Sequence, residues 1–255
     1  LEMWANILSN NFVGVCWFNP TQNISFNPLA GYEKGYFNAG SGLAEDAEQL
    51  HGVYLDTTYS GWGIILVVHF ALDTRTWEMI GEPEVIRDYR VVATETANDP
   101  QTGEVFGQFY NADLTRREFG VIDYQTMTRT TIGQSAHQYV AMGITSDGEA
   151  YGVATDGNFY HINRTTGKET LKGSTGIQVA RHDGNAYFQS GEIDPRTDEF
   201  YWASVDSTGL SMLYTVDLAD GHLTQVGALG NTNVIALTIP APKAADKAPA
   251  AVSAL

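Results

Sequence analysis

Apolar residues along the chain fall in short runs rich in Tyr, Phe, Trp, Thr and Val, and polar turns separate these runs. Such runs are typical of β-strands, which favour aromatic and β-branched side chains. Four segments repeat one plan of apolar strand, Asp or Asn, polar turn, second strand and glycine: residues 70–81, 121–133, 160–173 and 214–227. A fifth, degenerate copy covers residues 15–29. The repeats indicate one hairpin per structural unit.

The spacing inside the repeat is identical in three copies, from Asp123 to Gly133, Asn163 to Gly173 and Asp217 to Gly227. An Asp or Asn side chain caps a turn by accepting backbone N–H groups two residues further on, and glycine tolerates a positive φ. We therefore expect each Asx residue to close the turn and each glycine to supply the positive φ.

A second hairpin precedes the first in each unit. Its turns are residues 98–103 and 193–198, with a shorter equivalent at 145–148, and an aromatic strand follows each of them. A unit therefore has four antiparallel strands, named a, b, c and d in chain order. The Asx positions lie about one blade length apart, as in propeller repeats; they are Asn19, Asp73, Asp123, Asn163 and Asp217. The predicted fold is an all-β, five-bladed β-propeller.

The two ends of the repeat region predict how the ring closes. Residues 234–239 read as an a strand with no later partner, and residues 3–8 read as a b strand with none before it. Pairing the two completes a blade and removes two open sheet edges. Pro240 and Pro242 then stop the strand, because proline cannot donate a ladder hydrogen bond.

The charge and cysteine content of the chain limit the kinds of ligand and cross-link that it can have. The formal net charge is −16, so nucleic acid is an unsuitable ligand, because phosphate binding needs basic groups. No apolar run reaches the ~20 residues that a membrane span requires. Cys16 is the only cysteine, which excludes an internal disulfide and predicts a buried strand thiol. We expect a propeller over residues 1–240, and over 241–255 an Ala/Pro/Lys linker that leads into the start of a fibronectin-III-like module.

Two stretches carry a family resemblance. Residues 141–167 and 191–203 resemble consecutive blades of propeller domains found in large, modular bacterial surface and secreted proteins. In that family the propeller precedes fibronectin-III-like modules, which agrees with the tail. The resemblance extends over residues 85–255 and implies a fold and a modular, secreted or cell-surface context. It implies no catalytic motif.

Candidate binding residues lie on one predicted face. In a four-stranded meander the a–b and c–d turns share one face, where the regular turns fall, and the b–c and d–a loops share the other. Variable loops on a rigid scaffold are where binding usually occurs. Aromatic rings beside amide and charged groups suit sugars or extended peptides. The candidates are Tyr32, Tyr59, Trp62, Tyr89, Arg90, His137, Tyr139, His182 and Asn231.

An enzymatic alternative uses inner-strand carboxylates. Glu95 and Glu192 lie on matching strands two blades apart and could face the channel together, as the two carboxyl groups of a glycoside hydrolase or lyase do. The six histidines show no ligand spacing, so we expect neither a metal nor another cofactor. The favoured function is non-enzymatic recognition of carbohydrate or a protein partner, and a purely structural spacer is the third hypothesis.

Overall fold

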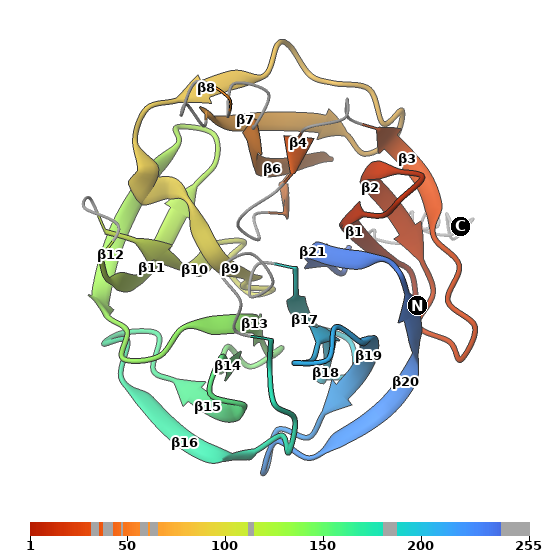
Figure 1. Cartoon of the computed structure of the whole chain (residues 1–255). Helices are drawn as coiled ribbons and strands as arrows, with labels where there is room; N and C mark the ends of the chain where they lie inside the picture. The colour runs from red at the N-terminus through yellow and green to blue at the C-terminus, as the bar shows by residue number, and fades with distance from the viewer. Residues whose placement is uncertain are drawn as a thin grey trace, which may run out of the picture.

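A computed structural model describes residues 1–31, 36–37, 43–46, 48–56, 61, 66–111, 115–180 and 188–240. Five antiparallel sheets stand around a central axis, and each passes from an inner strand outward to the rim (Figure 1). The predicted five-bladed β-propeller is therefore confirmed. None of the helices in these residues is long and apolar enough to cross a membrane.

We number the blades I to V from the first complete one in the chain. Blade I contains β4 (Tyr36–Phe37), β5 (Ala44–Asp46), β6 (Gln49–Asp56), β7 (Leu66–Asp73) and β8 (Glu84–Ile86). Blade II contains β9 (Ala93–Asn98), β10 (Val105–Tyr110), β11 (Arg117–Asp123) and β12 (Thr128–Gln134). Blade III contains β13 (Tyr139–Ile144), β14 (Ala150–Ala154), β15 (Asn158–Ile162) and β16 (Glu169–Ser174).

Blade IV contains β17 (Ser190–Asp194), β18 (Glu199–Val205), β19 (Ser211–Val216) and β20 (Leu223–Gly230). Blade V contains β21 (Asn233–Thr238), β1 (Met3–Leu8), β2 (Val13–Phe18) and β3 (Asn27–Gly31). The short 3₁₀ turn η2 (Tyr89–Val91) lies between blades I and II.

The core lies between the blades, because each middle strand buries both of its faces. On β18, Phe200 and Trp202 pack against blade III, whereas Tyr201 and Ala203 pack against blade V. Alternate side chains of a strand point to opposite faces, so one strand contributes to two neighbouring cores. Cys16 is fully buried in the core of blade V, as predicted, and burial raises the pKa of its thiol.

The ring closes as the sequence predicts. Strand β21 pairs antiparallel with β1, in a register that sets Trp4 opposite Thr238 and Leu8 opposite Asn233. Blade V thus takes its a strand from the C-terminal part of the chain and its other three strands from the N-terminal part (Figure 1). The inner strand of this blade, β21, is therefore hydrogen-bonded along its edge to β1.

The Asx turns also form as predicted. The backbone N–H groups of Gln125, Thr165 and Ala219 donate to the side-chain oxygens of Asp123, Asn163 and Asp217, at 2.8, 3.0 and 2.8 Å. These turns, with the a–b turns, form one face of the ring, which we call the turn face; it includes residues 99–104, 124–127, 145–149, 163–168 and 195–198. The opposite face, which we call the loop face, holds the b–c and d–a connections; it includes residues 87–92, 111, 115–116, 135–138, 155–157 and 231–232.

The repeat glycines require a correction. Gly133, Gly173 and Gly227 do not have a positive φ, although Gly81 of the first repeat does. Instead, a Cβ at Gly173 would lie 1.9 Å from the carbonyl oxygen of Asp220, in the c–d turn of the next blade. Equivalent approaches occur at the other two, where a Cβ would lie 2.5 Å from Thr166 O and 2.3 Å from Thr21 O. These glycines therefore let neighbouring blades approach each other.

We expect the Gly173→Ala variant to unfold more easily than the wild type. Its new methyl group would overlap the Asp220 carbonyl, and overpacking of this kind costs about 1–3 kcal/mol. Gly61→Ala is the control, because Gly61 has no atom within 4 Å of a Cβ and no positive φ. Urea unfolding of both variants measures the difference, and equal midpoints would contradict the proposed inter-blade role.

Candidate functional site

The structure places four of the predicted binding residues on the loop face. Tyr89, Arg90, His137 and Asn231 lie in d–a connections, and Tyr89 and Asn231 are exposed. Tyr139 begins β13 directly behind His137 and is only 1% exposed, so it supports this face from below. The other four predicted residues, Tyr32, Tyr59, Trp62 and His182, lie outside the described residues.

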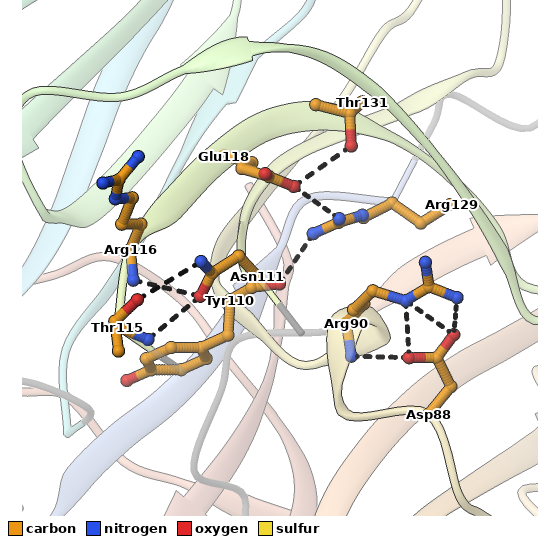
Figure 2. A network of polar contacts seen from close by, with 9 residues as sticks. All are labelled: Asp88, Arg90, Tyr110, Asn111, Thr115, Arg116, Glu118, Arg129 and Thr131. Carbon is orange, nitrogen blue, oxygen red and sulfur yellow. Dashed lines mark hydrogen bonds and ion pairs between the residues drawn. The ribbon is translucent and has the colours of Figure 1, made fainter. Parts of the chain in front are cut away.

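Arg90 belongs to a rigid turn at the loop end of blade II (Figure 2). Asp88 caps η2, because its Oδ1 accepts the backbone N–H of Arg90 at 3.0 Å. The guanidinium of Arg90 returns to the same carboxylate, with Nη2 2.6 Å from Oδ2 (Figure 2). The hydrogen bond from Arg90 lowers the pKa of Asp88, which therefore stays ionised. The turn thus presents Tyr89 and Arg90 in fixed positions.

The side chain of a second arginine, Arg129, reaches the loop end of blade II from the direction of the turn face. Arg129 lies near the start of β12, close to the turn face, and its side chain extends along the sheet. Its Nη1 donates to the carbonyl oxygen of Tyr110 at 2.7 Å and its Nη2 to Glu118 Oε2 at 2.6 Å (Figure 2). Its side chain is only 7% exposed, so Arg129 stabilises the blade.

The b–c loop of blade II adds two more arginines. The guanidinium carbon of Arg117 lies 5.2 Å from the centre of the Tyr110 ring, a cation–π arrangement. Arg116 is exposed, and Figure 2 shows its side chain extending away from the network. Within the described residues, no carboxylate forms an ion pair with either of them.

Blade III presents a histidine on the same face. His137 Nδ1 donates to Glu169 Oε2 at 2.6 Å, and its Nε2 lies 3.1 Å from the Tyr160 hydroxyl oxygen. The His137 and Tyr160 rings stack with centroids 4.3 Å apart. Tyr160 donates to Asp156 Oδ2 at 2.7 Å. His137 is about one-third exposed, at 34%, whereas the Glu169 side chain is 7% exposed. A buried carboxylate therefore orients an accessible imidazole.

The electrostatics of this cluster keep Asp156 ionised and Tyr160 neutral. Burial by itself would raise the pKa of Asp156, but hydrogen bonds from Tyr160 and Asn158 outweigh burial and lower it. Burial raises the pKa of Tyr160 to about 12, and the hydrogen bond to Asp156 adds to this effect. The cluster can therefore present an imidazole and an ionised carboxylate to a ligand at neutral pH.

The sequence reasoning missed Glu169, Tyr160 and Asp156, and also Arg116 and Arg117. The sequence did contain one signal that could have identified Glu169. Glu169 is the sixth residue after Asn163, and Arg129 is the sixth after Asp123. Both side chains extend from the same position of neighbouring blades to the loop face. The equivalent residue of blade IV is Leu223, which packs against the core. Only the copies in blades II and III carry a charge at this repeat position, and both side chains belong to the site.

Glu95 and Glu192, the two carboxylates of the enzymatic alternative, lie inside the ring at different distances from the turn face. Glu95 is completely buried, and Ser190 Oγ from β17 donates to its Oε1 at 3.1 Å. Since β9 and β17 are separated by blade III, this contact shows that side chains fill the channel at this depth. By alignment of the turns at Asp99 and Asp194, Glu192 lies two residues closer to the turn face, an offset of about 7 Å along a strand.

Glu192 lines a cavity of about 140 Å³ where the channel meets the turn face. Asn98 Nδ2 donates to Glu192 Oε2 at 2.8 Å and also lies 3.1 Å from the Thr238 hydroxyl. Burial raises the pKa of Glu192 to about 8, so it holds a proton at neutral pH. The remaining lining residues are Glu45, Asp99, Pro100, Gly103, Ile193, Pro195 and Ile239. Three acidic residues thus line this cavity, and Glu192 is the one that comes from the inner strand β17.

A second cavity, of about 260 Å³, lies between blades I and II on the turn face and is lined by His51 and Tyr124. His51 Nδ1 lies 3.1 Å from His69 Nε2, and the two rings are nearly coplanar. The two nitrogens thus lie within hydrogen-bond distance of each other, and the tautomers of the two rings decide which one donates. Burial lowers the pKa of His69 to about 4. In the described residues, no group of three or more metal-ligating side chains comes together.

The described geometry itself defines a β-propeller. No family profile and no curated protein matches the sequence, and the solved structures that resemble it are distant. Mala s 1, the major allergen of Malassezia sympodialis, has 10% identity and a TM-score of 0.46, over 86% of this chain and 74% of the allergen. The propeller domain of the trilobed protease from Pyrococcus furiosus has 13% identity and a TM-score of 0.37, over 76% and 57%. The β-xylosidase RS223 has 10% identity and a TM-score of 0.49, over 84% and 83%.

Proposed function

We propose that this chain is a non-enzymatic recognition module whose loop face binds a carbohydrate or a protein partner. The observation that carries the proposal is the position of His137, whose partly exposed imidazole is held by the buried Glu169 and stacked on Tyr160. A polar group fixed in this way loses little side-chain entropy on binding, so its hydrogen bonds contribute more to affinity. On the neighbouring blade, Arg90 forms an ion pair with Asp88, and Tyr89 precedes it in the η2 turn.

The alternative of glycoside hydrolysis has weaker support from the geometry. That reaction requires two carboxyl groups flanking the bond that is cleaved. Glu192 borders a cavity, but its predicted partner Glu95 is completely buried among the inner strands and hydrogen-bonded to Ser190. Glu45 and Asp99 also line this cavity, and Asp99 is 1% exposed and forms an ion pair with Arg164. The spacer hypothesis leaves the ordered side chains of the loop face without a role. From the sequence resemblance, we further propose a place at the bacterial cell surface or outside the cell.

We expect the His137→Ala variant to bind its ligand about tenfold more weakly, equivalent to ~1.4 kcal/mol. The substitution removes the partly exposed imidazole that Glu169 and Tyr160 hold on the loop face. His161→Ala is the matched control, because His161 is 28% exposed and bonds to Glu149 away from this face. A glycan array and a pull-down from culture fluid first identify a ligand for the whole chain, and biolayer interferometry then measures each variant.

Thermal melts separate loss of binding from loss of folding. His137→Gln keeps a hydrogen-bond donor beside Glu169 and should bind more tightly than His137→Ala. If neither screen detects a ligand, the recognition hypothesis fails and the spacer hypothesis replaces it. If a ligand is found but both histidine variants bind it as tightly as the wild type does, its site is not at His137.

A further inference from the structure

The loop end of blade II is strongly basic in a chain that is strongly acidic. We propose that this end, which we call the arginine patch (Arg87, Tyr89, Arg90, Arg116 and Arg117), binds an acidic oligosaccharide through its carboxylate or sulfate groups. This inference rests on the proposed recognition function and names the chemical class of its ligand.

The distribution of charge is the first argument. The chain has 14 basic and 30 acidic residues. Blade II and its incoming d–a loop nevertheless carry five arginines at or reaching the loop end; they are Arg87, Arg90, Arg116, Arg117 and Arg129. The described carboxylates among them are Asp88 and Glu118, each already engaged by an arginine. An anionic ligand would be repelled by the acidic surface elsewhere and attracted here.

The state of each arginine is the second argument. Arg90 and Arg129 are used internally, because they form ion pairs with Asp88 and Glu118. Arg116 is exposed, and Arg117 is partly buried against the Tyr110 ring. The Nε of Arg117 is buried and, among the described residues, has no hydrogen-bond partner. The exposed guanidinium of Arg116 is thus available to bind carboxylate or sulfate, for which its planar fork is suited. Arg117, which hydrogen-bonds the Tyr110 side chain, adds positive charge at the next position.

The aromatic content of the patch favours a sugar over an acidic peptide. Tyr89 is 43% exposed and is held by the η2 turn beside Arg90. A tyrosine ring covers the C–H surface of a sugar while its hydroxyl and the neighbouring guanidinium groups read polar substituents. Protein partners instead bury apolar anchors in well-packed pockets. Neither described cavity is lined by a residue of the patch.

Isothermal titration calorimetry on the whole chain tests the inference. The probes are a β-linked glucuronic-acid oligomer, a sulfated glucose oligomer, a neutral glucose oligomer of the same length, and poly-glutamate. We expect at least one acidic oligomer to bind at least tenfold more tightly than the neutral one, and this preference to shrink as salt screens the charges. The carboxylated and sulfated arms distinguish the two sources of negative charge.

Substitutions locate the site. Arg116→Gln combined with Arg117→Gln should weaken binding of the acidic oligomer at least tenfold. Arg75→Gln, on the turn face and 62% exposed, is the control and should change it less than twofold. Because Arg117 is partly buried, Arg116→Gln alone is measured as well, and thermal melts report folding. We expect this single variant to bind several-fold more weakly.

Three results would overturn the inference. If the neutral oligomer binds as tightly as the acidic ones, the recognition function stands but the arginine patch has no part in it. If poly-glutamate binds best and depends on the same arginines, the ligand is an acidic protein segment. If none of the probes binds while the screens described above identify another ligand, the recognition function again survives without this inference.

Discussion

Removing residues 234–255 should prevent the chain from forming a stable propeller, whereas removing only residues 241–255 should leave its melting temperature nearly unchanged. The first deletion takes away all of β21 except Asn233, and β21 is the inner strand of blade V. It exposes the ladder edge of β1 along the axis of the ring. It also removes Val234, Leu237 and Ile239 from the core between blades IV and V.

The expected size of this effect follows from burial. Each of these three side chains is at most 6% exposed. Burying a large apolar side chain contributes about 1.5–3 kcal/mol. Their combined loss is comparable to the entire stability of a typical domain, roughly 5–15 kcal/mol. Circular dichroism and thermal melts of the two truncated chains give the comparison. Equal melting temperatures would contradict closure by β21.

A point substitution tests the same strand without a deletion. Leu237→Asp places a charge in the blade IV–V core, where the side chain is 2% exposed. We expect a loss of more than ~3 kcal/mol, because an unpaired buried charge is strongly destabilising. Thr232→Asp, in the turn before β21 and partly exposed, is the control.

Stability should fall as the pH rises from 5 to 9, and Glu192 should be responsible for much of the decrease. Burial raises the pKa of Glu192 from 4.5 to about 8. Between these values the folded chain holds a proton that the unfolded chain has released. This contribution is therefore complete below pH 4.5 and is lost as the pH rises toward and past 8. Each pKa unit corresponds to about 1.4 kcal/mol, so we expect an effect of roughly 4 kcal/mol.

The Glu192→Gln variant should lose most of this pH dependence, because an amide keeps the shape of the protonated carboxyl group and does not ionise. Glu78→Gln, at an exposed position, should keep the wild-type profile. Urea unfolding at pH 5, 7 and 9 supplies the free energies. A Glu192→Gln variant with the same slope as the wild type would show that other groups control the profile.

The parts of the fold that could be predicted are those encoded locally. An Asx residue and a turn of fixed length specify a hairpin within one repeat, so the turns at Asp123, Asn163 and Asp217 were predictable. Closure was predictable because two apolar strands, one at each end of the repeat region, lacked partners. The inner strands of blade I could not be predicted, because β4 and β5 are only two and three residues long and carry no repeat motif.

The sequence predicted which face of the ring carries the candidate site, but it did not predict which side chains interact there. Loops between repeats could be assigned to one face, which is how Tyr89, Arg90 and His137 were found. The partner of His137 could not be assigned in this way, because Glu169 lies at the opposite end of its blade in sequence and reaches the loop face through its side chain. The prediction of a positive φ at Gly173 was wrong for a similar reason. The atom that excludes a side chain there belongs to the neighbouring blade, and the sequence of one repeat does not show it.

The closure strand also determines how the ring would respond to mechanical force. Since β1 and β21 are antiparallel, with Trp4 opposite Thr238, a pull on residues 1 and 240 acts on the same end of the pair. The hydrogen bonds of the ladder would then be loaded one after another, as in unzipping, and not all together in shear. Tension between its two ends would therefore open the propeller first at blade V, along the seam between β1 and β21. A load transmitted through one end alone would leave this seam unstressed.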